Sequence, residues 1–193
     1  GSIAWKGKYP NKKFVEEERR KTVSKISWHR EYLLDLVSSE DQIVKDNWIQ
    51  YYNELPPLNK LRYIIVGVDL AISQSQRADY TAMVVLYIFG KGKNLQIYIG
   101  KQMINKRLTL HQTVLTAKQL QYSISGGRSI TFVVEDIGYQ QAAIEHLKAE
   151  GIKAEGIKLH GQDKITRLSM TTPNFEQFQI FFHKENKQLI SQL

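Results

Sequence analysis

The chain has 193 residues, of which 42% are hydrophobic, and its 27 Lys and Arg exceed its 19 Asp and Glu to give a net charge of +8. This size and composition predict one globular domain with an extension, and the absence of cysteine excludes disulfides and thiolate zinc sites. No apolar run approaches the ~18–20 residues of a membrane span, and no secretory signal is present. The positive charge favours a polyanionic partner, above all nucleic acid.

Residues 1–60 are predicted to form an N-terminal arm or linker region that packs on the following domain. A charged segment at 12–21 has the pattern of a surface helix, with Glu preceding Arg and Lys by three or four positions. Aromatic clusters follow at 28–34 and 48–52, and Pro56-Pro57 ends the region. The region has too few apolar residues for a core of its own.

From residue 61 onward, strand and helix patterns alternate. Apolar runs separated by turn residues predict an antiparallel meander of three strands, at 63–71, 81–89 and 95–103. The elements predicted after it are a helix at 109–123, a strand at 129–135, a helix at 139–149, a strand at 152–159, helices at 164–170 and 174–178, a final strand or extended piece at 179–183 and an amphipathic helix at 184–193. This order predicts a mixed sheet with helices on its faces.

Two of the predicted strands carry a carboxylate at their ends. Asp69 follows the apolar run 63–68, and Glu135 follows a second apolar run, 130–134. An unpaired buried carboxylate costs several kcal/mol or shifts its pKa, so two such acids at one edge of a sheet indicate a divalent-metal site. Carboxylates are hard oxygen ligands of the kind that Mg²⁺ and Mn²⁺ prefer. Exposed strand ends or salt-bridge partners are the alternative role for both acids.

The predicted order of elements is that of the ribonuclease-H-like fold, and a series of short motifs is more specific. The motifs are Gly67-Val68-Asp69-Leu70-Ala71, Asp79-Tyr80-Thr81-Ala82, Val134-Glu135-Asp136-Ile137-Gly138-Tyr139-Gln140-Gln141, Asp163-Lys164-Ile165-Thr166-Arg167, Phe175-Glu176 and Ile180-Phe181-Phe182, with Arg30-Glu31-Tyr32-Leu33 and Trp48-Ile49-Gln50-Tyr51-Tyr52 upstream. With these motifs in this order over nearly the whole chain, the sequence resembles the nuclease domain of the large terminase subunit of tailed bacteriophages or prophages.

The resemblance implies an α/β, ribonuclease-H-like nuclease domain over residues 61–193. Its sheet is expected to be mixed and five-stranded, antiparallel in strands one to three and parallel afterwards, with flanking helices. The activity implied is divalent-metal-dependent endodeoxyribonuclease cleavage of concatemeric viral double-stranded DNA during genome packaging. Asp69 and Glu135 would be the catalytic metal ligands. The complete site would hold two Mg²⁺ or Mn²⁺ ions, which lie about 3.5–4 Å apart in this type of hydrolysis.

Other charged residues are candidates for the same site. Asp79 and Asp136 are further candidate metal ligands, although Glu135 is preferred over its neighbour Asp136 because successive strand residues point to opposite faces. Asp163 is predicted to cap a helix. The candidate contacts to DNA phosphates are Lys164, Arg167 and Arg77, for which the alternative is an exposed, solvated charge.

The chain departs from the family pattern at its C-terminal end. The family's third acid lies in a His-Asp-Asp-like motif, and this chain ends at Leu193, where that motif would shortly begin. We therefore expect a C-terminally truncated domain that is weakly active or inactive, with its third ligand either beyond Leu193 or supplied by another group. The Gly1-Ser2 start is typical of a cloning remnant and also predicts an excised piece of a longer protein.

The resemblance also implies partners and a location. Double-stranded DNA is the expected substrate, with no membrane partner. In the full-length protein the expected partners are an ATPase domain, the small terminase subunit and the portal, in the cytoplasm of the bacterial host at the procapsid. The alternatives are another nuclease of the same fold, such as a junction resolvase or transposase core, or a catalytically incomplete DNA-binding or motor-coupling module. The aromatic arm argues against the other nucleases, and the missing third acid keeps the DNA-binding or motor-coupling module open.

Overall fold

The computed structural model describes residues 42–70, 79–135, 140–158 and 163–190. Residues Asn47–Leu193 form one compact unit, and the fold described below is that of this unit. Most of the arm predicted for residues 1–60 lies outside the described residues, so its packing stays a prediction. No described helix is long and apolar enough to cross a lipid bilayer.

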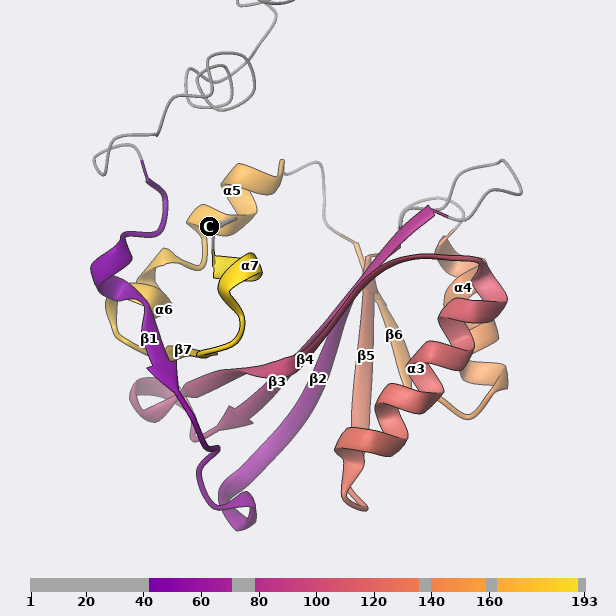
Figure 1. Ribbon diagram of the computed structural model, residues 1–193, viewed down its shortest axis with the longest axis horizontal. Helices are drawn as coiled ribbons and strands as arrows, with labels where there is room; N and C mark the ends of the chain where they lie inside the picture. Colours follow the sequence, from indigo (N-terminus) through magenta and orange to yellow (C-terminus); the bar gives the residue numbers. More distant parts are fainter. Residues whose placement is uncertain (1–41, 71–78, 136–139, 159–162, 191–193) are drawn as a thin grey trace, which may run out of the picture. The chain divides into compact units, whose positions relative to one another are not determined.

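A seven-stranded mixed sheet forms the centre of the unit (Figure 1). The strands are β1 (Gln50–Tyr52), β2 (Leu61–Leu70), β3 (Asp79–Phe89), β4 (Gln96–Leu108), β5 (Ile130–Glu135), β6 (Ala154–Ile157) and β7 (Ile180–His183). Their order across the sheet is β1-β7-β4-β3-β2-β5-β6. β2, β3 and β4 are antiparallel neighbours, whereas β5 runs parallel to β2 and β6 runs parallel to β5.

The predicted meander and the parallel strands after it are confirmed, but the predicted count of five strands was too low. β7 pairs in parallel with β4, and β1 pairs in parallel with β7. These strands have only 4 and 3 residues, too few to show a repeating pattern of alternation. β4 also runs to Leu108, beyond the predicted end at 103, because its pairing with β3 continues as far as Asp79.

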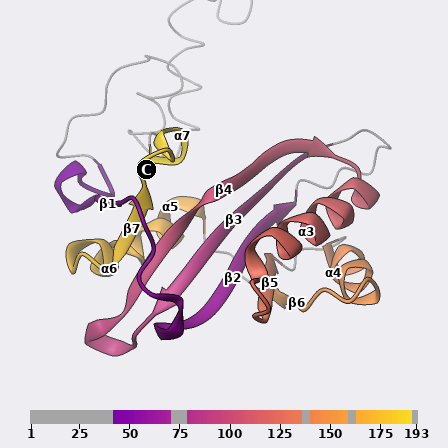
Figure 2. The same cartoon turned by 60° about the horizontal axis from the view of Figure 1, so that its bottom comes forward.

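Two helices cover one face of the sheet (Figure 2). α3 (Leu110–Ser125) begins at a capping box formed by Thr109 and Gln112 and ends at Gly126, whose φ of 48° suits a residue without a side chain. α4 (Gln140–Ala149) follows β5. The buried residues that these helices contribute to the core are Val114, Ala117 and Leu120 from α3 and Ala143, Ile144 and Leu147 from α4.

Short helices complete the unit. They are α5 (Lys164–Ser169), α6 (Thr172–Glu176) and α7 (Lys187–Ile190), together with the single 3₁₀ turns η2 (Asp46–Trp48), η3 (Leu58–Lys60) and η4 (Gly92–Asn94). α6 places the buried Phe175 against Phe182 of β7, with the ring centroids 6.2 Å apart. This contact ties the C-terminal helices to the β7 side of the sheet.

Alternation along β2 and β5 gives the sheet two different faces. Ile64, Val66, Val68 and Leu70 of β2 are buried in the core beneath the helices, as are Ile130, Phe132 and Val134 of β5. The residues between them point the other way and are half-buried or exposed: Ile65, Gly67, Asp69, Thr131, Val133 and Glu135. We call this side of β2, β5 and β6 the open face, and both candidate metal ligands lie on it.

Candidate functional site

Asp69 and Glu135 occupy neighbouring positions at the carboxyl ends of two adjacent strands. Val68 of β2 is paired with Val134 of β5, and the two acids are the next residue on each strand. Neighbouring strands lie about 4.8 Å apart, so the carboxylates project side by side from the open face. Their environments differ, because the side chain of Asp69 is 61% exposed and that of Glu135 only 19%.

Helix α5 brings two cations to these acids. Arg167 donates a hydrogen bond from Nη1 to Oε1 of Glu135 over 3.0 Å, and Lys164 places Nζ 3.8 Å from Oδ2 of Asp69. The two cations are three residues apart and therefore share one face of the helix. Lys164 and Arg167 were predicted to contact DNA phosphates, and that role stays a prediction. In the structure their anionic neighbours are the two carboxylates.

The start of α5 is held by Asp163. Its Oδ1 accepts a hydrogen bond from the backbone N–H of Thr166 over 2.7 Å, which confirms the predicted helix cap. The same hydrogen bond stabilises the charged carboxylate and lowers the pKa of Asp163 below its ordinary value. The cap thereby fixes the first turn of the helix that carries Lys164 and Arg167.

The two ion pairs differ in strength. Arg167 and Glu135 are both mostly shielded from water, with side-chain exposures of 24% and 19%, so their attraction is only partly screened. Lys164 is 83% exposed and its contact with Asp69 is long, so this pair contributes roughly 0–1 kcal/mol. Arg167 is thus the cation that occupies the site, and Lys164 lies at its solvent edge.

The other predicted site residues are only partly covered by the structure. Asp79 begins β3, where it is paired with Leu108, but its side chain lies outside the described residues. Asp136 and Arg77 also lie outside them. The roles predicted for these three residues stay predictions.

Asp69 and Glu135 have the chemistry that a hard divalent cation requires. They supply carboxylate oxygens from one face, and Mg²⁺ is commonly bound by one or two carboxylates while it keeps several waters. Within the described ranges, no group of three or more His, Asp and Glu lies close enough to hold a metal. The described residues therefore provide two candidate ligands, one of which, Glu135, accepts a hydrogen bond from Arg167.

Gln140, a polar residue next to the site, was not among the predicted site residues and appeared only within a sequence motif. Its Nε2 donates to the backbone oxygen of Leu70 over 2.7 Å and so fastens the start of α4 to the end of β2, one residue after Asp69. Its Oε1 is buried and has no hydrogen-bond partner among the described atoms. No pattern in the sequence marks this role, because the contact joins residues 70 positions apart.

Comparisons with known proteins agree with this architecture. No family model matches the sequence, and no curated protein matches it. The nuclease domain of the phage P22 large terminase matches the structure with a TM-score of 0.56 and 11% identity, over 77% of this chain and 74% of that one.

The large terminase nuclease of the thermophilic phage G20c matches too. Its structure with bound zinc gives a TM-score of 0.51 at 17% identity, over 75% of this chain and 80% of that one. Its structure with bound cobalt gives 0.51 at 16% identity, over 77% and 76%. The chain therefore has the ribonuclease-H-like fold of the phage large terminase nuclease domains, as its sequence motifs indicated.

Proposed function

We propose that this chain is the endonuclease domain of a large terminase subunit, which cuts concatemeric viral double-stranded DNA during genome packaging. The observation that carries the proposal is the placement of Asp69 and Glu135 side by side on the open face of a sheet with the terminase nuclease fold. The net charge of +8 supports a polyanionic substrate.

Asp69 and Glu135 would hold the divalent metal, Mg²⁺ or Mn²⁺ as part of a two-ion site, and the bound zinc and cobalt of the G20c structures support a divalent ion. When bound, the metal would activate water and stabilise charge on the phosphodiester. Glu135 provides a fixed carboxylate, because its surroundings shield it and Arg167 orients it. Asp69 is more exposed and provides the ligand nearer to solvent. Asp79, Asp136 or an acid beyond Leu193 would supply the third ligand.

Cations beside the acids would position the DNA. Lys164 lies at the solvent edge of the site, where it would meet a phosphate next to the bond that is cut. Contacts to phosphates carry no sequence information, so binding is expected to show little sequence preference and to weaken steeply with salt. The ATPase domain, small subunit and portal remain the proposed partners, with the host cytoplasm as the proposed location.

Plasmid cleavage in Mn²⁺ tests the proposal. Asp69→Asn and Glu135→Gln remove the ligand charge with little change in shape, and each is expected to lower cleavage by at least about 10–100-fold. Glu150→Gln is the matched control, since Glu150 follows α4 and pairs with Lys118 on the helix-covered side. Calorimetric titration with Mn²⁺ gives an independent readout, because both ligand variants are expected to lose heat of binding. Undiminished cleavage in both ligand variants would contradict the proposal.

A catalytically incomplete DNA-binding or motor-coupling module is the second candidate. The ion pairs of Arg167 with Glu135 and Lys164 with Asp69 favour it, because they neutralise both acids without a metal. Duplex binding combined with neither cleavage nor Mn²⁺ binding would support this candidate. A junction resolvase of the same fold would instead prefer four-way junctions over linear duplexes in the same assay.

A further inference from the structure

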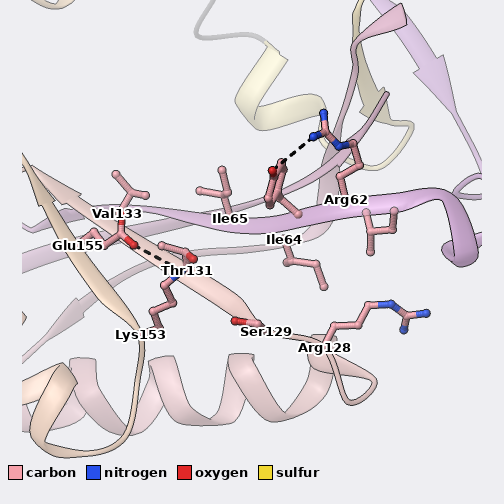
Figure 3. A pocket seen from close by; sticks show the side chains of 11 residues that line it. Arg62, Ile64, Ile65, Arg128, Ser129, Thr131, Val133, Lys153 and Glu155 are labelled. Carbon is pink, nitrogen blue, oxygen red and sulfur yellow. Dashed lines mark hydrogen bonds and ion pairs between the residues drawn. The ribbon is translucent and has the colours of Figure 1, made fainter. Parts of the chain in front are cut away.

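A groove of about 630 Å³ is lined by the first residues of β2 and β5 and by Lys153 and Glu155 at the start of β6 (Figure 3). Its floor includes Ile65 of β2 and Thr131 and Val133 of β5. The guanidinium groups of Arg62 and Arg128 lie toward one end of the view, and Lys153 and Glu155 lie toward the other. None of these side chains has a role in the nuclease function proposed above.

The groove and the acid pair belong to one continuous surface. Ile65 is paired with Thr131, and Gly67 is paired with Val133, which in turn is paired with Glu155. Asp69 and Glu135 form the next row on the same face. A strand rises about 3.3 Å per residue, so the row of Ile65 lies roughly 13 Å from the acids and the level of Tyr63 roughly 20 Å.

The charge of the groove is positive. Arg62, Arg128 and Lys153 are exposed, and the lining has one acid, Glu155, whose Oε1 lies 3.5 Å from Nζ of Lys153. Arg62 donates to the backbone oxygen of Gly90 over 2.9 Å. Among the described residues, Arg128 makes long contacts, of 3.4 and 3.5 Å, to the backbone oxygens of Gly126 and Leu58. A guanidinium has five N–H donors, so both arginines keep donors for an anion.

Gly67 keeps the floor low between the groove and the acids. Its neighbours Val66 and Val68 point into the core, so a side chain at this position would project from the open face. Among the described atoms, a Cβ built there has only the backbone oxygen of Val84 within 4 Å, at 4.0 Å, and the backbone is not in the left-handed region. The protein therefore has room for a larger residue here, although glycine weakens a strand and commonly marks the close approach of another backbone.

We propose that the open face is a DNA-binding track that runs from Arg62, Arg128 and Lys153, past Gly67, to Asp69 and Glu135. The occupant is double-stranded DNA, whose phosphates meet Arg62 and Arg128 about 20 Å from the acid pair and Lys153 about 13 Å from it. At 3.4 Å per base pair, the longer distance corresponds to about six base pairs beside the bond that is cut. The inference rests on the proposed nuclease function and adds a second, distant region of substrate contact to it.

Charge complementarity favours DNA over a protein occupant. Three of the four charged side chains that line the groove are cations, and the half-buried floor residues Ile65, Thr131 and Val133 are uncharged. A second copy of this chain would bring a surface of the same net positive charge of +8 to these cations. A polyanion neutralises them and also gains entropy from the release of its own counterions.

Duplex binding in Ca²⁺ or without divalent metal, followed by fluorescence anisotropy over a range of salt concentrations, tests the cations. The double variant Arg62→Gln with Arg128→Gln is expected to weaken binding and to reduce the slope of log K against log salt by about 2. The control is the double variant Lys118→Gln with Lys148→Gln, which removes two positive charges from α3 and α4 instead. It is expected to keep the wild-type slope of log K against log salt. Duplexes that extend about six base pairs or more from the cut position are expected to bind the wild type more tightly than shorter ones. The double variant of Arg62 and Arg128 is expected to bind long and short duplexes equally.

Substitution of Gly67 tests the path between the two regions. Gly67→Val is expected to fold with an unchanged or higher melting temperature, because valine favours strands, but to bind duplex DNA more weakly than Gly67→Ala and the wild type. Thr131→Val is the matched control, since it changes the polarity of the floor without adding bulk and is expected to bind like the wild type. Normal binding by a folded Gly67→Val protein would overturn the proposed path.

The outcomes separate this inference from the function on which it rests. Normal affinity and salt slope in the Arg62 and Arg128 double variant, with cleavage that still depends on Asp69 and Glu135, would overturn the track and leave the nuclease intact. A wild type that neither binds nor cleaves duplex DNA would overturn both. Sedimentation run in parallel tests whether a second copy of the chain occupies the groove. If the Arg62 and Arg128 double variant no longer self-associates but still binds DNA, the groove is an interface between copies and the track is overturned.

Discussion

In the proposed site, Arg167 and a metal ion would compete for the carboxylate of Glu135, so removal of Arg167 is expected to shift stability and metal affinity in opposite directions. In the wild type, Nη1 of Arg167 lies 3.0 Å from Oε1 of Glu135. Arg167→Gln removes the charge and leaves Glu135 largely shielded and without its cation. The variant is therefore expected to be less stable than the wild type but to bind Mn²⁺ more tightly.

The magnitude follows from the burial of the pair. An exposed ion pair contributes about 0–1 kcal/mol, and removal of one partner from a fully buried pair costs about 3–5 kcal/mol. Side-chain exposures of 24% and 19% place this pair between those limits, and a hydrogen bond to a charged group contributes about 1.5–3 kcal/mol. We expect a loss of about 1–3 kcal/mol in the free energy of unfolding. Because 1.4 kcal/mol corresponds to a factor of ten, Mn²⁺ affinity is expected to rise about tenfold.

Calorimetric titration with Mn²⁺ in the absence of DNA, combined with urea unfolding without metal, measures both quantities. Lys164→Gln is the internal control, since its pair is exposed and 3.8 Å long, and it is expected to change the Mn²⁺ affinity by less than about threefold. Weaker Mn²⁺ binding in Arg167→Gln than in the wild type would refute the competition. It would show instead that Arg167 prepares Glu135 for the metal.

Three further predictions concern the fold around the site. Burial, with Tyr87 and Tyr98 nearby, raises the pKa of Tyr52 to about 12, so the folded state holds this proton more tightly than the unfolded state. The resulting stability is complete below pH ~10 and is lost as the pH rises through about 12. Melting curves are expected to show that Tyr52→Phe loses less stability than the wild type over this alkaline range. Asp163→Ala removes the cap of α5 and is expected to speed amide hydrogen exchange in residues 164–169, whereas Asp163→Asn retains a capping oxygen; equal exchange in both variants would argue against the cap. Phe132→Ala leaves a cavity at a fully buried position of β5 and is expected to cost about 3–5 kcal/mol in urea unfolding, a figure that a loss below 1 kcal/mol would contradict.

Local patterns predicted the parts of this protein that depend on near neighbours. The apolar runs within residues 63–89 and the polar loop between them predicted β2 and β3, and both strands lie where expected to within two residues at each described end. The cap at Asp163 was predicted because its hydrogen bond joins residues only three positions apart. The motifs around Asp69 and Glu135 also led to the fold that the comparison with solved terminase nucleases shows.

Contacts between distant segments were decided by the tertiary structure alone. Sequence predicted a strand or extended piece at 179–183, but it did not predict β1 or the place of either strand in the sheet: the edge of β4 offers unpaired backbone groups to β7, which in turn pairs with β1. The bond from Arg167 to Glu135 joins residues 32 positions apart, so no local pattern could show that the acid is already paired. Sequence identified Asp69 and Glu135 as acids at strand ends because charge and apolar runs are local properties. Their position side by side, and the open face that leads to them, arise from the parallel pairing of β2 with β5, which folding establishes between segments far apart in the chain.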